Sequence, residues 1–206
     1  MNNVWATEQL QTIRTLMERT ALYRRAMAPV SIISGVAGVT AGFIGWHWRI
    51  TATTQFCLFW ASVALVAGLA SLLLIRRQAF KDAEPFWSPP TRRVAQAISL
   101  PVILGAVFAL MTATMSKEET DPQALVIVWL ILYGCGLHAA GFFMPRGIRW
   151  LGWIFAFSGV ALLATVGLYD LPPQATHLQM AATFGGLHLI YGVYLHFTET
   201  KSTDHK

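Results

Sequence analysis

Six stretches of this chain contain eighteen or more consecutive residues without Asp, Glu, Lys or Arg. They lie at about 27–48, 54–75, 94–115, 123–144, 149–169 and 177–197. In the fifth, the uncharged stretch begins directly after Arg149. A helix of roughly 20 apolar residues crosses the hydrocarbon core of a bilayer. Of the 206 residues, 55% are hydrophobic and 12% are charged, whereas a soluble domain is about a quarter charged. We therefore expect an all-α integral membrane bundle of six transmembrane helices within residues 27–197.

The basic residues are distributed unevenly between the two sides of these spans. Thirteen of the 15 Lys and Arg residues lie before span 1, between spans 2 and 3, around the turn between spans 4 and 5, or after span 6. Short loops rich in Lys and Arg stay in the cytoplasm. The pattern predicts a multi-pass protein with both termini cytoplasmic. Its basic surplus then faces anionic headgroups of the lipid bilayer, and nucleic-acid binding is not expected.

Residues 1–26 are expected to form an amphipathic helix at the cytoplasmic face. Its apolar residues recur at helical spacing along one side, and its charged residues fall largely on the other. Such a helix lies in the membrane interface, covers the end of the bundle or docks a partner. At the other end of the chain, residues 198–206 are expected to be a polar cytoplasmic tail.

The segment 76–93 between spans 2 and 3, "RRQAFKDAEPFWSPPTRR", is the second distinctive cytoplasmic piece. Its three prolines argue against a continuous helix. Trp and Arg together are typical of protein-binding hot spots, which makes this segment a candidate site for a cytoplasmic protein partner. The alternative is that its aromatic residues anchor the chain at the headgroup level. The candidate partner-binding residues are Phe86, Trp87, Arg92 and Arg93.

Small residues spaced about four apart in spans 1, 4 and 6 predict close helix packing. Small side chains let helix backbones approach each other in lipid, where packing drives association. The predicted packing positions are Ser34, Gly38, Gly42, Gly45, Gly134, Gly141, Gly185 and Gly192.

Two histidines, His138 and His188, lie deep within the predicted spans on these small-residue faces. The first interpretation is that each neutral imidazole hydrogen-bonds a neighbouring helix and fixes packing. The alternatives are a b-type haem held by both histidines as axial ligands, or an apolar small molecule. These two residues are the candidate ligand-binding site, although no cofactor or metal is expected under the first interpretation.

The chain shows no pattern typical of an enzyme. HExxH, GxSxG and P-loop motifs are absent, and all ten acidic residues lie outside the predicted spans. Proton-coupled transporters typically use buried carboxylates as relays, so that class is also disfavoured. We expect a non-enzymatic sensory, regulatory or scaffolding module that docks a cytoplasmic partner, with a small-solute transporter or transporter subunit as the alternative.

Three stretches together are similar to a family of small six-helix bacterial inner-membrane proteins with no assigned activity. They are "IRTLMERTALYRRAMAPVSIISGVAG" (13–38), "DAEPFWSPPTRRVAQA" (82–97) and "LHAAGFFMPRG" (137–147). The resemblance implies a location in the bacterial inner membrane. It implies no functional residues.

Overall fold

The computed structural model describes residues 26–83, 85–115, 122–168 and 171–203, and all but the last residue of the predicted amphipathic helix 1–26 lies outside them. Within this part the chain is helical and contains no strand, which confirms the all-α prediction. Five helices are long and apolar enough to cross a membrane. They are Ala26–His47, α2 (Thr53–Lys81), α3 (Pro89–Met115), α4 (Gln123–Ala140) and α5 (Arg146–Thr165).

The last predicted span corresponds to three consecutive helical segments rather than to one α-helix. They are α6 (Ala175–Met180), the π-helix η1 (Ala181–Leu187) and α7 (His188–Thr203). The π-helix consists largely of Ala and Gly. Helices with hydrogen bonds between residues five apart are rare and occur mostly as single turns within α-helices. α7 continues to Thr203, so the first residues of the expected polar tail are helical.

The loop between α2 and α3 is shorter than the sequence suggested. α2 continues to Lys81, and α3 begins at Pro89. Pro89 and Pro90 therefore occupy the first turn of a helix, where backbone N–H groups have no intrahelical acceptor and proline costs little. Of the residues between the two helices, 82–83 and 85–88 are non-helical.

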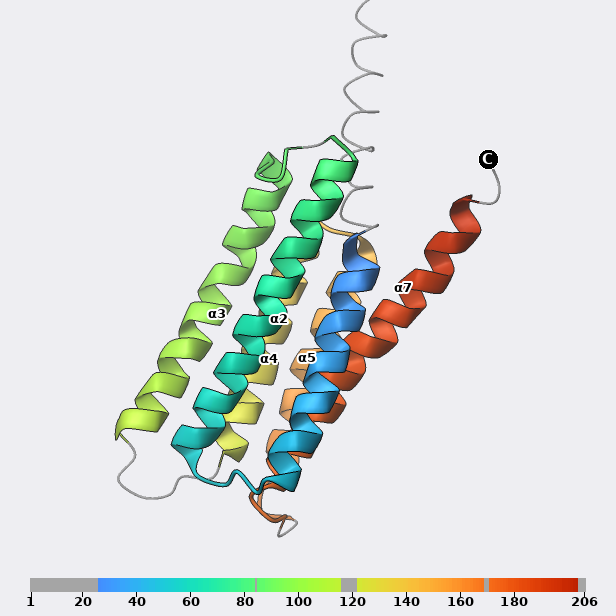
Figure 1. Ribbon diagram of the computed structural model, residues 1–206. Helices are drawn as coiled ribbons and strands as arrows, with labels where there is room; N and C mark the ends of the chain where they lie inside the picture. The colour runs from blue at the N-terminus through green and yellow to red at the C-terminus, as the bar shows by residue number, and fades with distance from the viewer. Residues whose placement is uncertain (1–25, 84, 116–121, 169–170, 204–206) are drawn as a thin grey trace, which may run out of the picture.

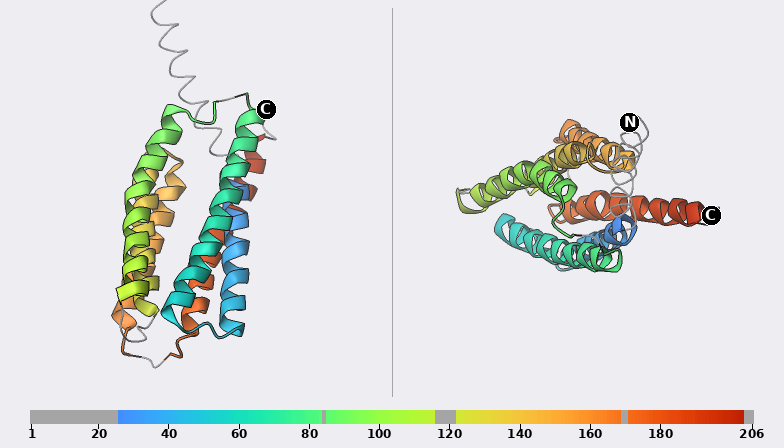
Figure 2. Two further views of the ribbon diagram at one scale, coloured as in Figure 1. Left: turned by 60° about the vertical axis from the view of Figure 1, so that its left-hand side comes forward. Right: turned by 90° about the horizontal axis from the view of Figure 1, so that it is seen from above.

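The helices pack as two groups with the α6–α7 run between them. α3, α4 and α5 lie on one side, and the helix Ala26–His47 and α2 lie on the other (Figures 1 and 2). Successive helices alternate in direction. The start of Ala26–His47, the α2–α3 loop, the α4–α5 turn and the end of α7 therefore share one end, at the top of Figure 1. We call this the basic end, because it carries Arg76, Arg77, Arg92, Arg93 and Arg149.

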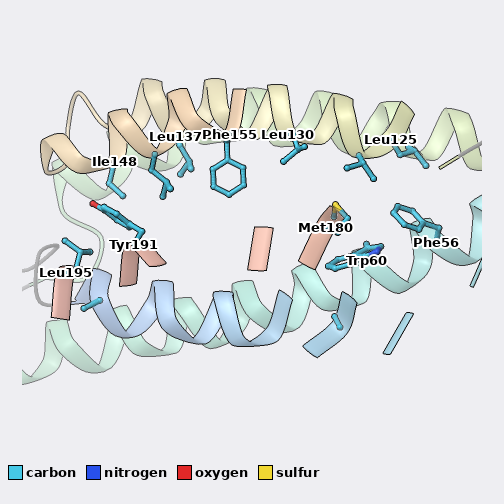
Figure 3. Packing of buried hydrophobic residues seen from close by; sticks show 14 residues of the cluster. Phe56, Trp60, Leu125, Leu130, Leu137, Ile148, Phe155, Met180, Tyr191 and Leu195 are labelled. Carbon is cyan, nitrogen blue, oxygen red and sulfur yellow. The ribbon is translucent and has the colours of Figure 1, made fainter. Parts of the chain in front are cut away.

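Apolar side chains fill the space between the two groups. Phe155 and Leu130 are fully buried and point from α5 and α4 toward the α6–α7 run, while Trp60 points in from α2 (Figure 3). The outward faces of the helices are also apolar, and this is the pattern expected of helices that meet lipid rather than water. Large exposed apolar side chains on α2 and α3 include Leu58, Leu65, Leu69, Leu73, Leu100, Ile103 and Leu110.

Candidate functional site

A seam of small residues joins the helix Ala26–His47 to the α6–α7 run. A Cβ atom added at Gly38 would lie 2.8 Å from Cα of Gly185, and one added at Gly35 would lie 2.5 Å from the backbone N of Leu189. Real Cβ atoms do not approach backbone so closely, so both positions require glycine. The buried positions recur alternately three and four residues apart, as in a coiled-coil seam. They are Ala28, Ser31, Gly35, Gly38, Gly42 and Gly45, and Ala26 and Ala41 are buried outside this series.

The other predicted packing positions divide between three contacts. Gly134 of α4 and Gly141, the C-cap residue of that helix, face α5, where added Cβ atoms would lie 2.5 Å from the N of Ala156 and 2.8 Å from the N of Arg149. Gly192 of α7 packs against the helix Ala26–His47. Ser34 faces α2 instead, with its Oγ 3.5 Å from Oγ of Ser71.

His177 forms a fully buried polar node at the end opposite the basic end. Nε1–H of Trp60 donates to Nδ1 of His177 over 3.0 Å, so the other ring nitrogen, Nε2, carries the proton and donates to the carbonyl of Ile50 over 2.9 Å. The rings of Phe56 and Phe59 pack around the imidazole, with centroids 4.8 and 5.6 Å from its own. A side chain on Gly45 would overlap the ring.

Sequence reasoning missed this node, because His177 and Trp60 are 117 residues apart. His177 also stands at the start of a predicted span, where a solvated histidine is unremarkable. The signal that could have found it is indirect. Gly45 ends the small-residue stripe of span 1 at the same depth, and a glycine at the end of such a stripe leaves room for a ring from the facing helix.

His188 lies in a second polar node, near the middle of the bundle. Its Nδ1 donates to the carbonyl of Phe184 over 2.7 Å, one turn earlier, which leaves Nε2 to accept from the hydroxyl of Tyr133 over 2.8 Å. The rings of Phe155 and Phe184 pack against this pair. The contact joins α4 to α7, and both imidazole nitrogens are used.

His138 occupies a different environment and shares no contact with His188. Its ring meets the edges of Phe142 and Trp153, with centroids 5.4 and 5.1 Å away. Its Nδ1 is buried and has no hydrogen-bond partner among the described residues.

This arrangement does not fit a haem held by the two histidines. An axial ligand needs a free imidazole nitrogen, and both nitrogens of His188 are hydrogen-bonded within the protein. Among the described residues, no group of three or more His, Cys, Asp or Glu could hold a metal ion.

The candidate partner-binding residues lie at the basic end. The ring centroids of Phe86 and Trp87 are 6.4 Å apart, and Trp87 is 60% exposed. The guanidinium carbon of Arg93 lies 5.9 Å from the centre of the Phe143 ring in the α4–α5 turn, within the range of a cation–π contact. The structure thus connects the start of α3 to that turn. Arg92 is exposed.

Comparisons with known proteins assign no relative to this chain. No protein-family model matches it, and neither a curated protein nor a solved structure is significantly similar to it. Proposals about function therefore depend on the chain's own residues.

Proposed function

We propose that this chain is a six-span protein of the bacterial inner membrane, with both termini in the cytoplasm. The α6–α7 run is the sixth span: its 175–203 stretch is about 40 Å long at 1.5 Å per residue, which exceeds the hydrocarbon thickness of about 30 Å. The clustering of arginines at one end of the bundle supports the orientation, because basic loops are retained in the cytoplasm.

Within that membrane the chain acts as a non-enzymatic module that docks a cytoplasmic protein at the basic end. The docking surface consists of Phe86, Trp87, Arg92 and Arg93. The observation that carries the proposal is the contact between Arg93 and Phe143, which ties this surface to the α4–α5 turn while Trp87 stays 60% exposed. A large exposed aromatic side chain on an anchored segment, beside arginines, has the composition of a binding hot spot.

The charge of the docking surface specifies the partner's chemistry. Asp82 is the one acidic residue with a described side chain, and it accepts a hydrogen bond from Nε2 of Gln78 over 3.0 Å at the end of α2. The described chain thus offers little negative charge to offset Arg92 and Arg93. An acidic surface patch on a cytoplasmic protein is the complementary partner.

The bundle interior supports a module without catalysis or ion transport. In both polar nodes the imidazole nitrogens are hydrogen-bonded within the protein. His177 bonds to Trp60 and Ile50, and His188 bonds to Tyr133 and Phe184. Proton-coupled transporters and pumps typically use buried carboxylates as relays. No Asp, Glu or Lys occurs between residues 123 and 168, and the same is true of 54–80 and 94–115.

Site-specific photocrosslinking in living cells tests the docking proposal. A photoreactive amino acid at position 87 is expected to give a discrete adduct with one acidic cytoplasmic protein. The same residue at position 65, which is 64% exposed in the middle of α2, provides the control and should give no protein adduct. Arg92→Ala should weaken the adduct at 87 several-fold, because the complementary charge is lost.

Two results would count against docking. One is the absence of any protein adduct at position 87 in cells that crosslink well at other sites. The other is an adduct whose yield is unchanged by Arg92→Ala and Arg93→Ala together. The first result would identify Phe86 and Trp87 as interfacial anchors, and the second would show that the arginines do not select an acidic partner.

A further inference from the structure

A shallow apolar groove runs along the outward face of α5. It is lined by Trp150, Trp153, Ile154, Phe157, Ser158 and Ala161, and its volume is about 620 Å³. The large side chains form its walls, since Trp150 and Phe157 are 70% and 61% exposed, while Ser158 and Ala161 are the smallest residues in its lining.

A cation stands at the end of this groove, at the basic end of the bundle. Arg149 precedes Trp150, and its guanidinium carbon lies 5.2 Å from the centre of the Phe142 ring. Its aliphatic stem packs where a side chain on Gly141 would otherwise lie. Arg149 is also in the first turn of α5, where unpaired backbone N–H groups and the helix dipole favour an anion. The Arg149 side chain is thus held in place by these packing contacts.

The imidazole of His138, which has one buried nitrogen without a hydrogen-bond partner in the described part of the chain, lies between the cation and the groove. His138 contacts Phe142, which carries the Arg149 guanidinium, and Trp153, which lines the groove. Its buried Nδ1 has no hydrogen-bond partner among the described residues, in contrast to the fully bonded His177 and His188. A polar atom left unpaired in an apolar environment costs free energy. Nδ1 is covered by protein atoms, so a ligand oxygen at this depth would approach the other ring nitrogen, Nε2.

We propose that this face of α5 binds one anionic phospholipid. The phosphate lies at Arg149, the glycerol and ester oxygens lie at the depth of His138, and one acyl chain occupies the groove beside Trp153 and Phe157. The order of the three features, cationic, then polar, then apolar, follows the order of the parts of a phospholipid in one leaflet. A soluble phosphate would use the first feature alone, and a partner helix would not need the cation.

Native mass spectrometry of the purified, partly delipidated full chain tests the proposal, with phosphatidylglycerol and phosphatidylcholine of identical acyl chains added in turn. We expect retention of one phosphatidylglycerol, at least several-fold above phosphatidylcholine. Arg149→Gln should lower that retention about tenfold, because the charge-assisted hydrogen bond to the phosphate is lost. Ser158→Leu, which fills the groove, should lower retention of both lipids.

The matched control is Arg76→Gln. Arg76 is at the same end, and its guanidinium carbon lies 5.5 Å from the Phe80 ring, so the variant loses the same charge and the same kind of cation–π contact away from the groove. It should retain phosphatidylglycerol as the unaltered chain does. Arg149→Lys preserves the charge and should restore most of the binding, which separates loss of charge from loss of packing.

The proposal is overturned if Arg76→Gln and Arg149→Gln reduce retention equally, because the lipid then responds to diffuse surface charge. Equal retention of the two lipids, or retention unaffected by Ser158→Leu, would overturn it as well. His138→Phe keeps the ring contacts and removes the polar atoms. A chain that carries it should remain folded by circular dichroism and bind phosphatidylglycerol several-fold more weakly; unchanged binding would contradict the placement of the ester oxygens.

Discussion

Nε1–H of Trp60 donates a hydrogen bond to Nδ1 of His177 over 3.0 Å, which joins α2 to the start of the α6–α7 run. The same imidazole donates to the carbonyl of Ile50 in the loop after the helix Ala26–His47. One fully buried side chain thus connects three parts of the chain that are distant in sequence. This node fixes the bundle at the end opposite the basic end, while the glycine seam fixes the same helices along their length.

His177→Ala should destabilise the bundle by about 2–4 kcal/mol. The substitution removes two hydrogen bonds, leaves the Trp60 indole N–H without an acceptor, and opens a cavity between Phe56 and Phe59. The free energy of unfolding, from denaturant titration in mixed micelles, provides the measurement. His47→Ala, at an exposed position nearby in the first helix, is the control and should change it by less than about 0.5 kcal/mol. Equal effects of the two substitutions would mean that the node contributes nothing specific.

Gly38→Leu should destabilise the protein by about 3 kcal/mol, because its Cβ would lie 2.8 Å from Cα of Gly185 and neither backbone can yield without separating the helices. The matched control is Gly68→Leu on α2, where an added Cβ meets nothing within 4 Å. The same unfolding titration should leave the control nearly unchanged. A harmless Gly38→Leu would place this face of the helix against lipid.

Tyr133→Phe should lower the free energy of unfolding by only about 0.6–1.7 kcal/mol. The phenyl ring keeps its packing on Phe155 and Phe184, and the change removes a single interhelical hydrogen bond to His188, which is worth about that much between membrane helices. Combining it with His188→Phe should cost less than the sum of the two single changes, as expected for partners in one contact. Strict additivity in this double-mutant cycle would show that the two side chains do not interact.

The positions of the helices can be predicted from the sequence because each helix depends on residues that are close together in the chain. The apolar runs predict where helices lie, and five of the six are single helices long and apolar enough to cross a membrane. Glycine spacing indicated which face of 26–47 packs closely, yet it placed Ser34 on the seam and omitted Gly35. Residues spaced four apart gradually leave the packed face of the helix, because the residues on that face are alternately three and four apart.

What the pattern could not predict depends on partners distant in the chain. Nothing local to His177 indicates that Trp60 and Ile50 meet it, and nothing local to His188 indicates Tyr133. The prediction paired His138 with His188 because they lie at similar depths in their predicted spans. In the structure, the rotation of α4 about its axis places the His138 ring against Trp153 instead. The π-helix at Ala181–Leu187 was also missed, because its small residues fit an α-helix equally well.

The central claim is a six-span bundle whose basic end faces the cytoplasm, since the docking surface has no partner otherwise. Alkaline-phosphatase fusions along the chain test it most directly, because the enzyme is active only outside the cytoplasm. Fusions within 50–53, 116–121 and 170–176 should be active, and fusions within 82–90 and after residue 200 should be inactive at equal expression. Activity within 82–90, or inactivity within 170–176, would contradict the proposed topology and with it the docking of a cytoplasmic partner.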